Sequence, residues 1–255
     1  MSNPVFSNNK AFGRGAPVGF EAPTIPGAPG VTPLDDRMSY DGTITKAASL
    51  FLLAAASAVL VGMFAPNLAM PLMIVGFVLA LIVMFTTKNG PKPALMATTV
   101  AVYGGAVGGI SVVYEATYGG IILQALIGTA VVFAVSLVAY RSGRIRNMGK
   151  INKFLSIAAP AYIVFSLINV AMVSFGGFNM REVEIGGLGV NLGLVLSLFA
   201  ITIGALMLIS DFDFVANGVR NGLPAQWEWT AAYGLVFAII WIYLEMLRLM
   251  SYLRR

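Results

Sequence analysis

Very few ionisable side chains lie inside the apolar stretches of this sequence, and Glu245 is the most informative of them. It occurs late in the last apolar stretch, in the run Tyr243-Leu244-Glu245-Met246-Leu247-Arg248. A charge at the centre of a bilayer costs at least ~2.5–3.5 kcal/mol, so such a group needs a partner, water or a proton. Glu245 is therefore a candidate ion or proton site. Two structural alternatives together are about as well supported as this functional interpretation. One is an ion pair with Arg248 on the same helical face, and the other is a solvated carboxylate at the membrane rim.

Two aspartates, Asp211 and Asp213, close the preceding apolar stretch in the run Ser210-Asp211-Phe212-Asp213-Phe214. Residues two positions apart point to different sides of a helix, so at most one of them faces a given cavity. For Asp213 we favour a solvated position at the membrane rim. For Asp211 a solvated rim position and an ion or proton site are closely matched interpretations.

Glu115 lies in a short polar turn between two apolar stretches, and a solvated loop carboxylate is its favoured interpretation. An acidic lip at a pore mouth is the sharper alternative. The basic run from Arg141 to Lys153 is most simply an anchor at the cytoplasmic membrane surface. The chain has no Cys and no His, so any pH sensing must come from carboxylates.

Membrane-spanning helices must position these candidates. Hydrophobic residues make up 58% of the chain and charged residues only 11%, with a mean hydropathy of +0.84. A span needs about 20 apolar residues, and backbone groups in lipid must bond internally, which favours α-helices. We predict an all-α integral membrane protein, a bundle of seven transmembrane helices at residues 44–65, 68–86, 94–114, 118–140, 154–175, 188–210 and 229–253.

Residues 1–43 differ from the transmembrane domain, residues 44–255, in holding six of the chain's twelve prolines. We expect a disordered, Pro/Gly-rich cytoplasmic tail, because such a segment buries too little apolar surface to fold. With the tail inside, twelve Lys and Arg lie on inner segments and four on outer segments, namely Arg181, Arg248, Arg254 and Arg255. This imbalance favours a cytoplasmic N-terminus. The side of the C-terminus stays open, because a re-entrant last span would place both ends inside.

Several protein classes are disfavoured by the residues present. A light-driven rhodopsin needs a Schiff-base lysine in the last helix, and residues 229–253 contain none. Metalloproteases and Ser-His hydrolases need histidine, and the glycine-flanked aspartate pattern of intramembrane aspartyl proteases is absent. The net charge of +5 indicates membrane orientation and not nucleic-acid binding. We predict a protein that is not an enzyme and holds no cofactor.

Two stretches resemble the transmembrane Bax inhibitor motif family. Its last helix typically carries Tyr-Leu-Asp and ends in Leu-Arg, and here Tyr243-Leu244-Glu245 is followed by Tyr252-Leu253-Arg254. Its sixth helix typically ends in an aspartate with an apolar residue four positions later, as Asp211 and Val215 do here. The start Asn3-Pro4-Val5 and residues 38–47 resemble a bacterial branch, so the resemblance implies a multi-pass protein of the bacterial inner membrane.

The resemblance implies a central last helix and a pH-sensitive calcium leak across the bilayer. In that picture Asp211 and Glu245 share a proton and hold the pore shut, because two close carboxylates in low dielectric cannot both ionise cheaply. When ionised, they would attract Ca²⁺, a hard cation that prefers oxygen ligands. Ca²⁺ and protons are the implied permeant or bound ions. Direct pairing follows from the resemblance alone, because our spans place Glu245 ~24 Å along the last helix and Asp211 near the inner rim.

Three departures from the family pattern concern the same site. The acid of the last helix is Glu245 where the family has Asp, and Arg248 stands where a neutral polar residue is typical. Arg248 could therefore hold Glu245 ionised. An arginine common at the end of the second helix is replaced by Thr86-Thr87-Lys88, so a latch that uses that charge is altered.

The leading hypothesis is thus a calcium or other cation leak gated by protonation of Asp211 and Glu245, with Arg248, Asp213, Glu115 and Lys88 as modulators. The alternative is a non-catalytic scaffold or modulator of a membrane protease, suggested by the tail, the basic loop and some bacterial relatives. A membrane hydrolase has the weakest support.

Overall fold

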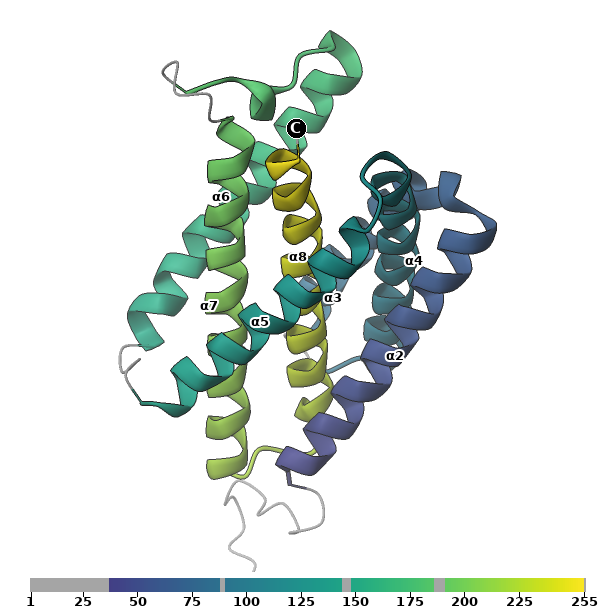
Figure 1. Cartoon of the computed structure of the whole chain (residues 1–255). Coiled ribbons are helices and arrows are strands. Elements are labelled where there is room, and N and C mark those ends of the chain that lie inside the picture. Colours follow the sequence, from purple (N-terminus) through teal and green to yellow (C-terminus); the bar gives the residue numbers. More distant parts are fainter. Residues whose placement is uncertain (1–36, 88–89, 144–147, 186–190, 255) are drawn as a thin grey trace, which may run out of the picture. The chain divides into compact units, whose positions relative to one another are not determined.

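Seven long helices make up most of the part of the chain that the structure describes (Figure 1). The structure is a computed structural model, and it describes residues 37–87, 90–143, 148–185 and 191–254. Each helix is long and apolar enough to cross a bilayer, which confirms the predicted membrane fold. The helices are α2 Tyr40–Phe64, α3 Ala69–Thr86, α4 Pro93–Thr117, α5 Ile121–Arg141, α6 Met148–Gly176, α7 Leu192–Arg220 and α8 Trp227–Leu253.

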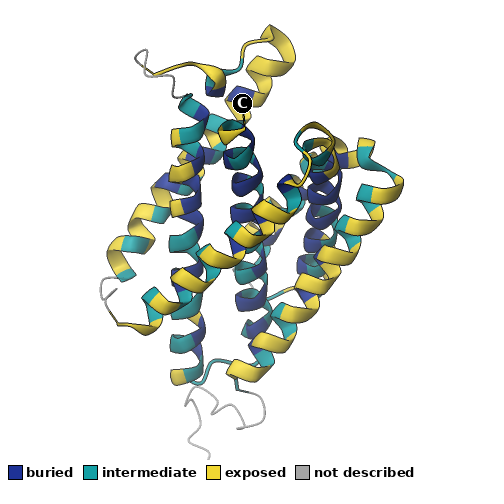
Figure 2. Cartoon of the chain, in the orientation of Figure 1, coloured by how far each residue is buried: buried dark blue, intermediate teal, exposed yellow. Residues whose placement is uncertain are grey.

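The last helix, α8, lies in the middle of the bundle, as predicted. It contacts α2, α4, α5 and α7, and Figure 2 shows it largely buried. In the most apolar stretch of each helix, 56% of the residues of α8 and 61% of those of α4 are buried, against 11% for α2. The outer helices expose large apolar side chains such as Phe64 and Phe175, as lipid-facing helices do.

Glycines let α4 pack closely against α2. A Cβ atom at Gly104 would collide with the backbone of Ala54, and one at Gly108 would collide with the carbonyl group of Ala58. Small residues at such positions allow helix backbones in a membrane to approach each other. The glycines of the third span therefore serve helix packing.

The sixth spanning helix, α7, extends ten residues beyond the predicted end at Ser210 and stops at Arg220. No glycine or proline interrupts the Asp-Phe run. The helix ends only where Gly222 adopts a φ of +63° and where the N–H of Leu223 donates to the carbonyl of Gly218, a common C-terminal capping pattern. Asp211 and Asp213 therefore lie within the helix and do not close it.

The first helix begins at Tyr40, four residues before the predicted span. Ser39 caps it, because its Oγ accepts a hydrogen bond of 3.0 Å from the N–H of Gly42. Met38 and Thr43 are buried, so the end of the predicted tail belongs to the bundle. Residues 1–36 of the predicted disordered tail lie outside the described residues.

We call the end of the bundle where α2 and α8 begin the near end, and the opposite end, where α8 stops, the far end. At the near end, Lys46 of α2 bonds to Glu228 in the first turn of α8. At the far end, α8 stops beside the turn between α4 and α5, where Arg254 donates to the carbonyls of Tyr118 and Gly119. The last helix thus runs through the bundle from one end to the other (Figure 1).

Candidate functional site

Glu245 lies on α8 near the far end of the bundle and is only 3% exposed. The helix is apolar around most of its circumference there, and its neighbours Ile242, Tyr243, Met246 and Leu247 are buried as well. Because α8 is surrounded by α2, α4, α5 and α7, the carboxylate of Glu245 is enclosed with it. The interpretation of Glu245 as a solvated rim group is therefore wrong.

Arg248 is the first partner of Glu245. It lies three residues later on the same helical face, and its Nη1 donates to Oε1 of Glu245. The Arg248 side chain stays 32% exposed while that of Glu245 is buried. The local ion pair that the spacing predicted is thus present.

Arg181 is a second cation beside Glu245, and its place there is not predicted by the sequence. It lies in the short 3-10 turn η5, Met180–Glu182, between α6 and α7, where it was counted as an outer loop charge. In the structure Arg181 is buried, with 6% exposure, and its Nη1 is 4.0 Å from Oε2 of Glu245. Both of these buried atoms lack a hydrogen-bond partner among the described residues.

Side chains of α6 hold the guanidinium of Arg181 in this position. Its Nη2 donates to the hydroxyl of Tyr162 at 2.9 Å and to that of Ser166 at 3.0 Å. The guanidinium also lies over the rings of Tyr162 and Phe165, at 5.4 and 5.7 Å from their centroids. Cation–π contacts and hydrogen bonds stabilise a buried guanidinium. The turn itself is fixed by Asn169, whose Oδ1 accepts from the N–H of Met180.

The resulting cluster places one carboxylate between two guanidinium groups. A buried charge needs this kind of compensation, and removing one member of a buried pair typically costs about 3–5 kcal/mol. The cluster joins α8 to the connection between α6 and α7, elements that are far apart in sequence. No regular residue spacing predicts that Arg181 contacts Glu245. The one feature in the sequence that could have indicated a buried role is the position of this arginine close to an apolar span.

Asp211 occupies a different level of the bundle. Its carboxylate lies against Gly234 of α8, where an added Cβ atom would be 2.8 Å from Oδ1. Glu245 is eleven residues beyond Gly234, or about 16 Å along the helix. The shared-proton pair that the resemblance implied is therefore not formed in the described arrangement. Within the described ranges, no hydrogen bond or ion pair compensates the carboxylate of Asp211.

The other predicted modulators have local roles. Asp213 accepts a hydrogen bond of 2.8 Å from the side-chain amide of Asn217, one turn later on α7. Glu115 lies in the last turn of α4 and not in a turn between helices. Its carboxylate accepts from the backbone N–H groups of Gly120 and Ile122, so it caps the start of α5. Lys88 lies outside the described residues.

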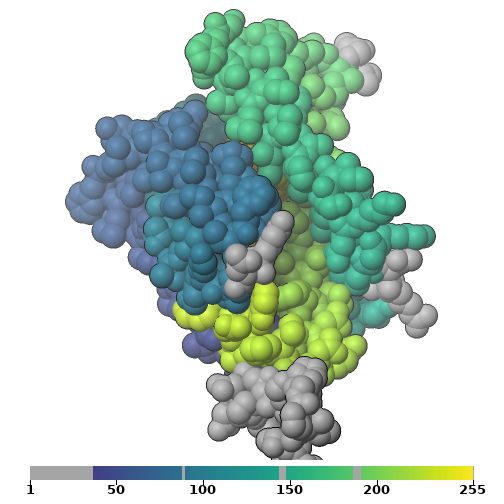
Figure 3. Space-filling view, turned by 180° about the vertical axis from the view of Figure 1, so that it is seen from behind, coloured from purple at the N-terminus to yellow at the C-terminus, as the bar shows by residue number. Residues whose placement is uncertain are grey.

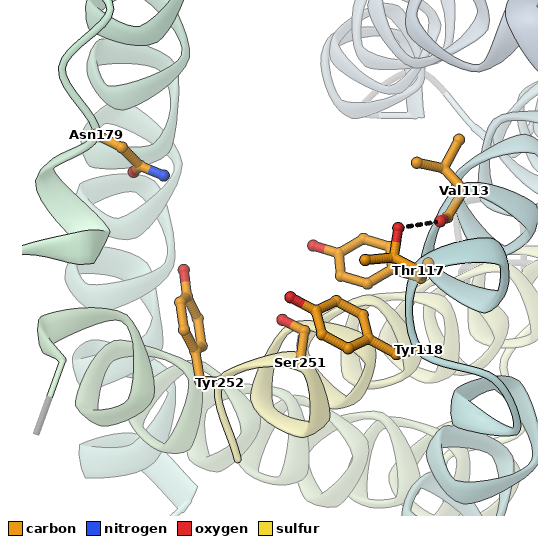
Figure 4. A pocket seen from close by; sticks show the side chains of 7 residues that line it. Val113, Thr117, Tyr118, Asn179, Ser251 and Tyr252 are labelled. Atoms are coloured by element: carbon orange, nitrogen blue, oxygen red, sulfur yellow. Dashed lines mark hydrogen bonds between the residues drawn. The ribbon is translucent and has the colours of Figure 1, made fainter. Parts of the chain in front are cut away.

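A pocket of about 230 Å³ opens at the far end, between the ends of α4 and α8 and the connection before α7. Figure 4 shows the hydroxyl-bearing side chains of Tyr118, Ser251 and Tyr252 around this space, with Asn179 opposite Thr117. Ser251, which lines this pocket, follows Arg248 by three residues on α8, and its Oγ donates to the backbone carbonyl of Arg248 at 2.7 Å. Among the described residues, no group of three or more His, Cys, Asp or Glu side chains converges as a metal site would require.

Comparison with known families agrees with this architecture. The sequence profile of the family described as Bax inhibitor 1 like matches residues 3–255. No curated protein matches the chain in sequence. Since the profile covers nearly the whole chain and the described residues form seven membrane-length helices with the last one in the centre, this protein belongs to the Bax inhibitor 1 like family.

Proposed function

We propose that this protein is a pH-sensitive cation leak channel, with Ca²⁺ as the permeant ion, and that the structure corresponds to its closed state. The observation that carries the proposal is the buried carboxylate of Glu245, which lies in the central helix and faces a guanidinium from another element at 4.0 Å. An ionisable residue inside a membrane bundle is a functional candidate because its burial is costly.

The cluster has the chemistry of a gate. Oε2 of Glu245 is buried, lacks a hydrogen-bond partner among the described residues, and faces Arg181. A carboxylate oxygen is a ligand that Ca²⁺ prefers, and Arg181 occupies the place where a cation would approach it. When the connection carrying Arg181 moves away, Glu245 becomes available to cations that enter through the hydroxyl-lined pocket beside Arg248.

Asp211 is the proton-sensitive group in this proposal. A carboxylate carries its negative charge only when it has lost its proton, so the charge of Asp211 depends on pH. Ionised Asp211 attracts cations to the interface of α7 and α8, and protonated Asp211 does not. Cation flux is therefore expected to rise with pH. Asp211, on α7, and Glu245, on α8, act as two separate sites at different levels of the bundle and not as one pair.

The protein is expected to be oriented with the near end in the cytoplasm, in the inner membrane of a bacterial cell. Described basic residues at that end include Lys92, Arg141, Lys150, Lys153 and Arg220. Of the far-end arginines counted against this orientation, Arg181 and Arg248 belong to the ion cluster and carry little weight as loop charges. Since the chain has no Cys, a single cysteine at Gly119 or Arg220 reports the side by reaction with an impermeant maleimide.

The test is calcium flux into dye-loaded proteoliposomes from about pH 6 to about pH 8. Wild-type flux should rise with pH, and the Asp211→Asn protein should lose that dependence. Absence of flux at every pH, from protein shown to be folded, would contradict the channel. The alternative of a protease scaffold or modulator depends on a tail whose residues 1–36 lie outside the described ranges, so no described contact favours it.

A further inference from the structure

A short segment before the first helix crosses the turn between α7 and α8 at the near end of the bundle. We call residues Arg37, Met38 and Ser39 the strap. The N–H of Met38 donates to the carbonyl of Leu223 at 2.6 Å, and Arg37 forms an isolated β-bridge with Pro224. Figure 3 shows the residues around this turn, in yellow-green, reaching the surface at the lower end of the view.

Met38 closes the interface of α7 and α8 at this end. Its side chain is 3% exposed and packs with Val215 of α7 and Ala231 of α8 in a small apolar cluster. Val215 lies one helical turn after Asp211, and Ala231 lies about one turn before Gly234, against which Asp211 rests. The sulfur of Met38 also lies against Gly218, so its side chain stands one to two turns, about 6–10 Å, from the level of Asp211 on the near-end side.

Glu228, in the first turn of α8, bonds to the strap and to α2. Its Oε1 accepts hydrogen bonds from the N–H of Ser39 at 2.8 Å and from its hydroxyl at 3.0 Å. Its Oε2 pairs with Nζ of Lys46 at 2.6 Å, and Glu228 itself is 4% exposed. Gly42 makes room for this carboxylate, because a Cβ atom there would collide with it. The carboxylate also lies at the N-termini of α2 and α8, where helix dipoles favour a negative charge.

The strap and Glu228 lie at the near end of the bundle, at the opposite end from the ion cluster of Glu245. We infer that the strap is a second gate, an autoinhibitory contact in which Met38 seals Asp211 from the near-end solvent and Glu228 holds the seal shut. The inference rests on the proposed channel for its consequence, flux, but the seal itself can be measured separately. Release of the strap opens the interface of α7 and α8 one to two turns from Asp211.

The test uses the full chain in lipid nanodiscs and a cysteine at Ala231, which is 2% exposed and lies beneath Met38. The chain has no other cysteine, so reaction with a small impermeant thiosulfonate reports this site alone. Glu228→Gln and Met38→Ala are introduced separately into the Ala231→Cys protein. Asp41→Asn is the matched control, because Asp41 is an exposed acid in the first turn of α2. Unchanged hydrogen exchange in α4 shows that each variant is folded.

Glu228→Gln and Met38→Ala should each speed labelling by about tenfold or more, the effect expected for losing a charge-assisted hydrogen bond or a buried apolar contact. Hydrogen exchange of the strap amides should accelerate in parallel, and calcium flux should rise. Asp41→Asn should change none of these. Equal labelling in all four proteins would overturn the seal, and so would faster strap exchange without faster labelling. Faster labelling without flux in any protein would support the seal and overturn the channel.

Discussion

Nη1 of Arg181 and Oε2 of Glu245 face each other across 4.0 Å inside the far end of the bundle, and neither atom has a hydrogen-bond partner among the described residues. One side chain comes from a turn between two helices, and the other from the central helix. Because Glu245 also pairs with Arg248, the carboxylate is held from two directions. Any movement of the connection before α7 changes the electrostatic environment of Glu245.

Replacing Arg181 tests whether it closes the far end. Arg181→Gln removes the charge that faces Glu245 and should raise calcium flux several-fold at the upper end of the pH range. Arg181→Lys keeps the charge but loses the flat guanidinium that lies over Tyr162 and Phe165, so an intermediate flux is expected. Arg254→Gln, at the same end but exposed, is the control. Equal flux in the Arg181 and Arg254 variants would exclude a gating role for Arg181.

Replacing Glu245 tests the energetics of the cluster. Glu245→Gln leaves two buried or half-buried guanidinium groups without a negative partner, which should lower the free energy of unfolding by about 3–5 kcal/mol. Thermal unfolding in detergent micelles measures the loss. Combining Glu245→Gln with Arg181→Gln should recover part of it, because the double variant removes one uncompensated charge. Strictly additive losses would mean that the two side chains do not interact.

Replacing Asp211 should have the opposite consequence for stability. Its carboxylate is partly exposed and has no compensating partner in the described part of the chain, and such a charge is unfavourable inside a membrane bundle. Asp211→Asn should therefore leave thermal stability unchanged or raised at neutral pH while removing the pH dependence of flux. Asp213→Asn is the matched control two residues away, since Asp213 is already bonded to Asn217. A pH-dependent flux that survives in Asp211→Asn would assign the sensor to another group.

The close packing of α2 and α4 predicts a strong effect of one methyl group. Gly108→Ala would place a Cβ atom on the carbonyl group of Ala58, so the helices must separate and stability should fall by about 1–3 kcal/mol. Gly149→Ala is the control, because no atom lies within 4 Å of a Cβ atom there and alanine favours a helix. Similar melting temperatures for both variants would contradict the packing described between α2 and α4.

The seven spans and the scarcity of intramembrane charges were determined by the sequence itself. A backbone in lipid must satisfy its hydrogen bonds within each segment, so an apolar run of sufficient length becomes a helix wherever its neighbours lie. The same local rule placed Arg248 beside Glu245, since residues three apart on a helix are adjacent. Helix ends were less accurate: α7 continued to Arg220, because nothing before Gly222 breaks the helix.

Contacts between elements were decided only by the tertiary structure. Arg181 reaches Glu245 from a turn between helices, Asp211 rests on Gly234 and not beside Glu245, and Met38 inserts between α7 and α8. None of these contacts can be predicted from a regular spacing of residues in the sequence, because each depends on how helices of similar apolarity are arranged around α8. Local hydrogen bonding in lipid thus fixes which segments are helices, whereas side-chain packing and the pairing of buried charges fix which residues meet.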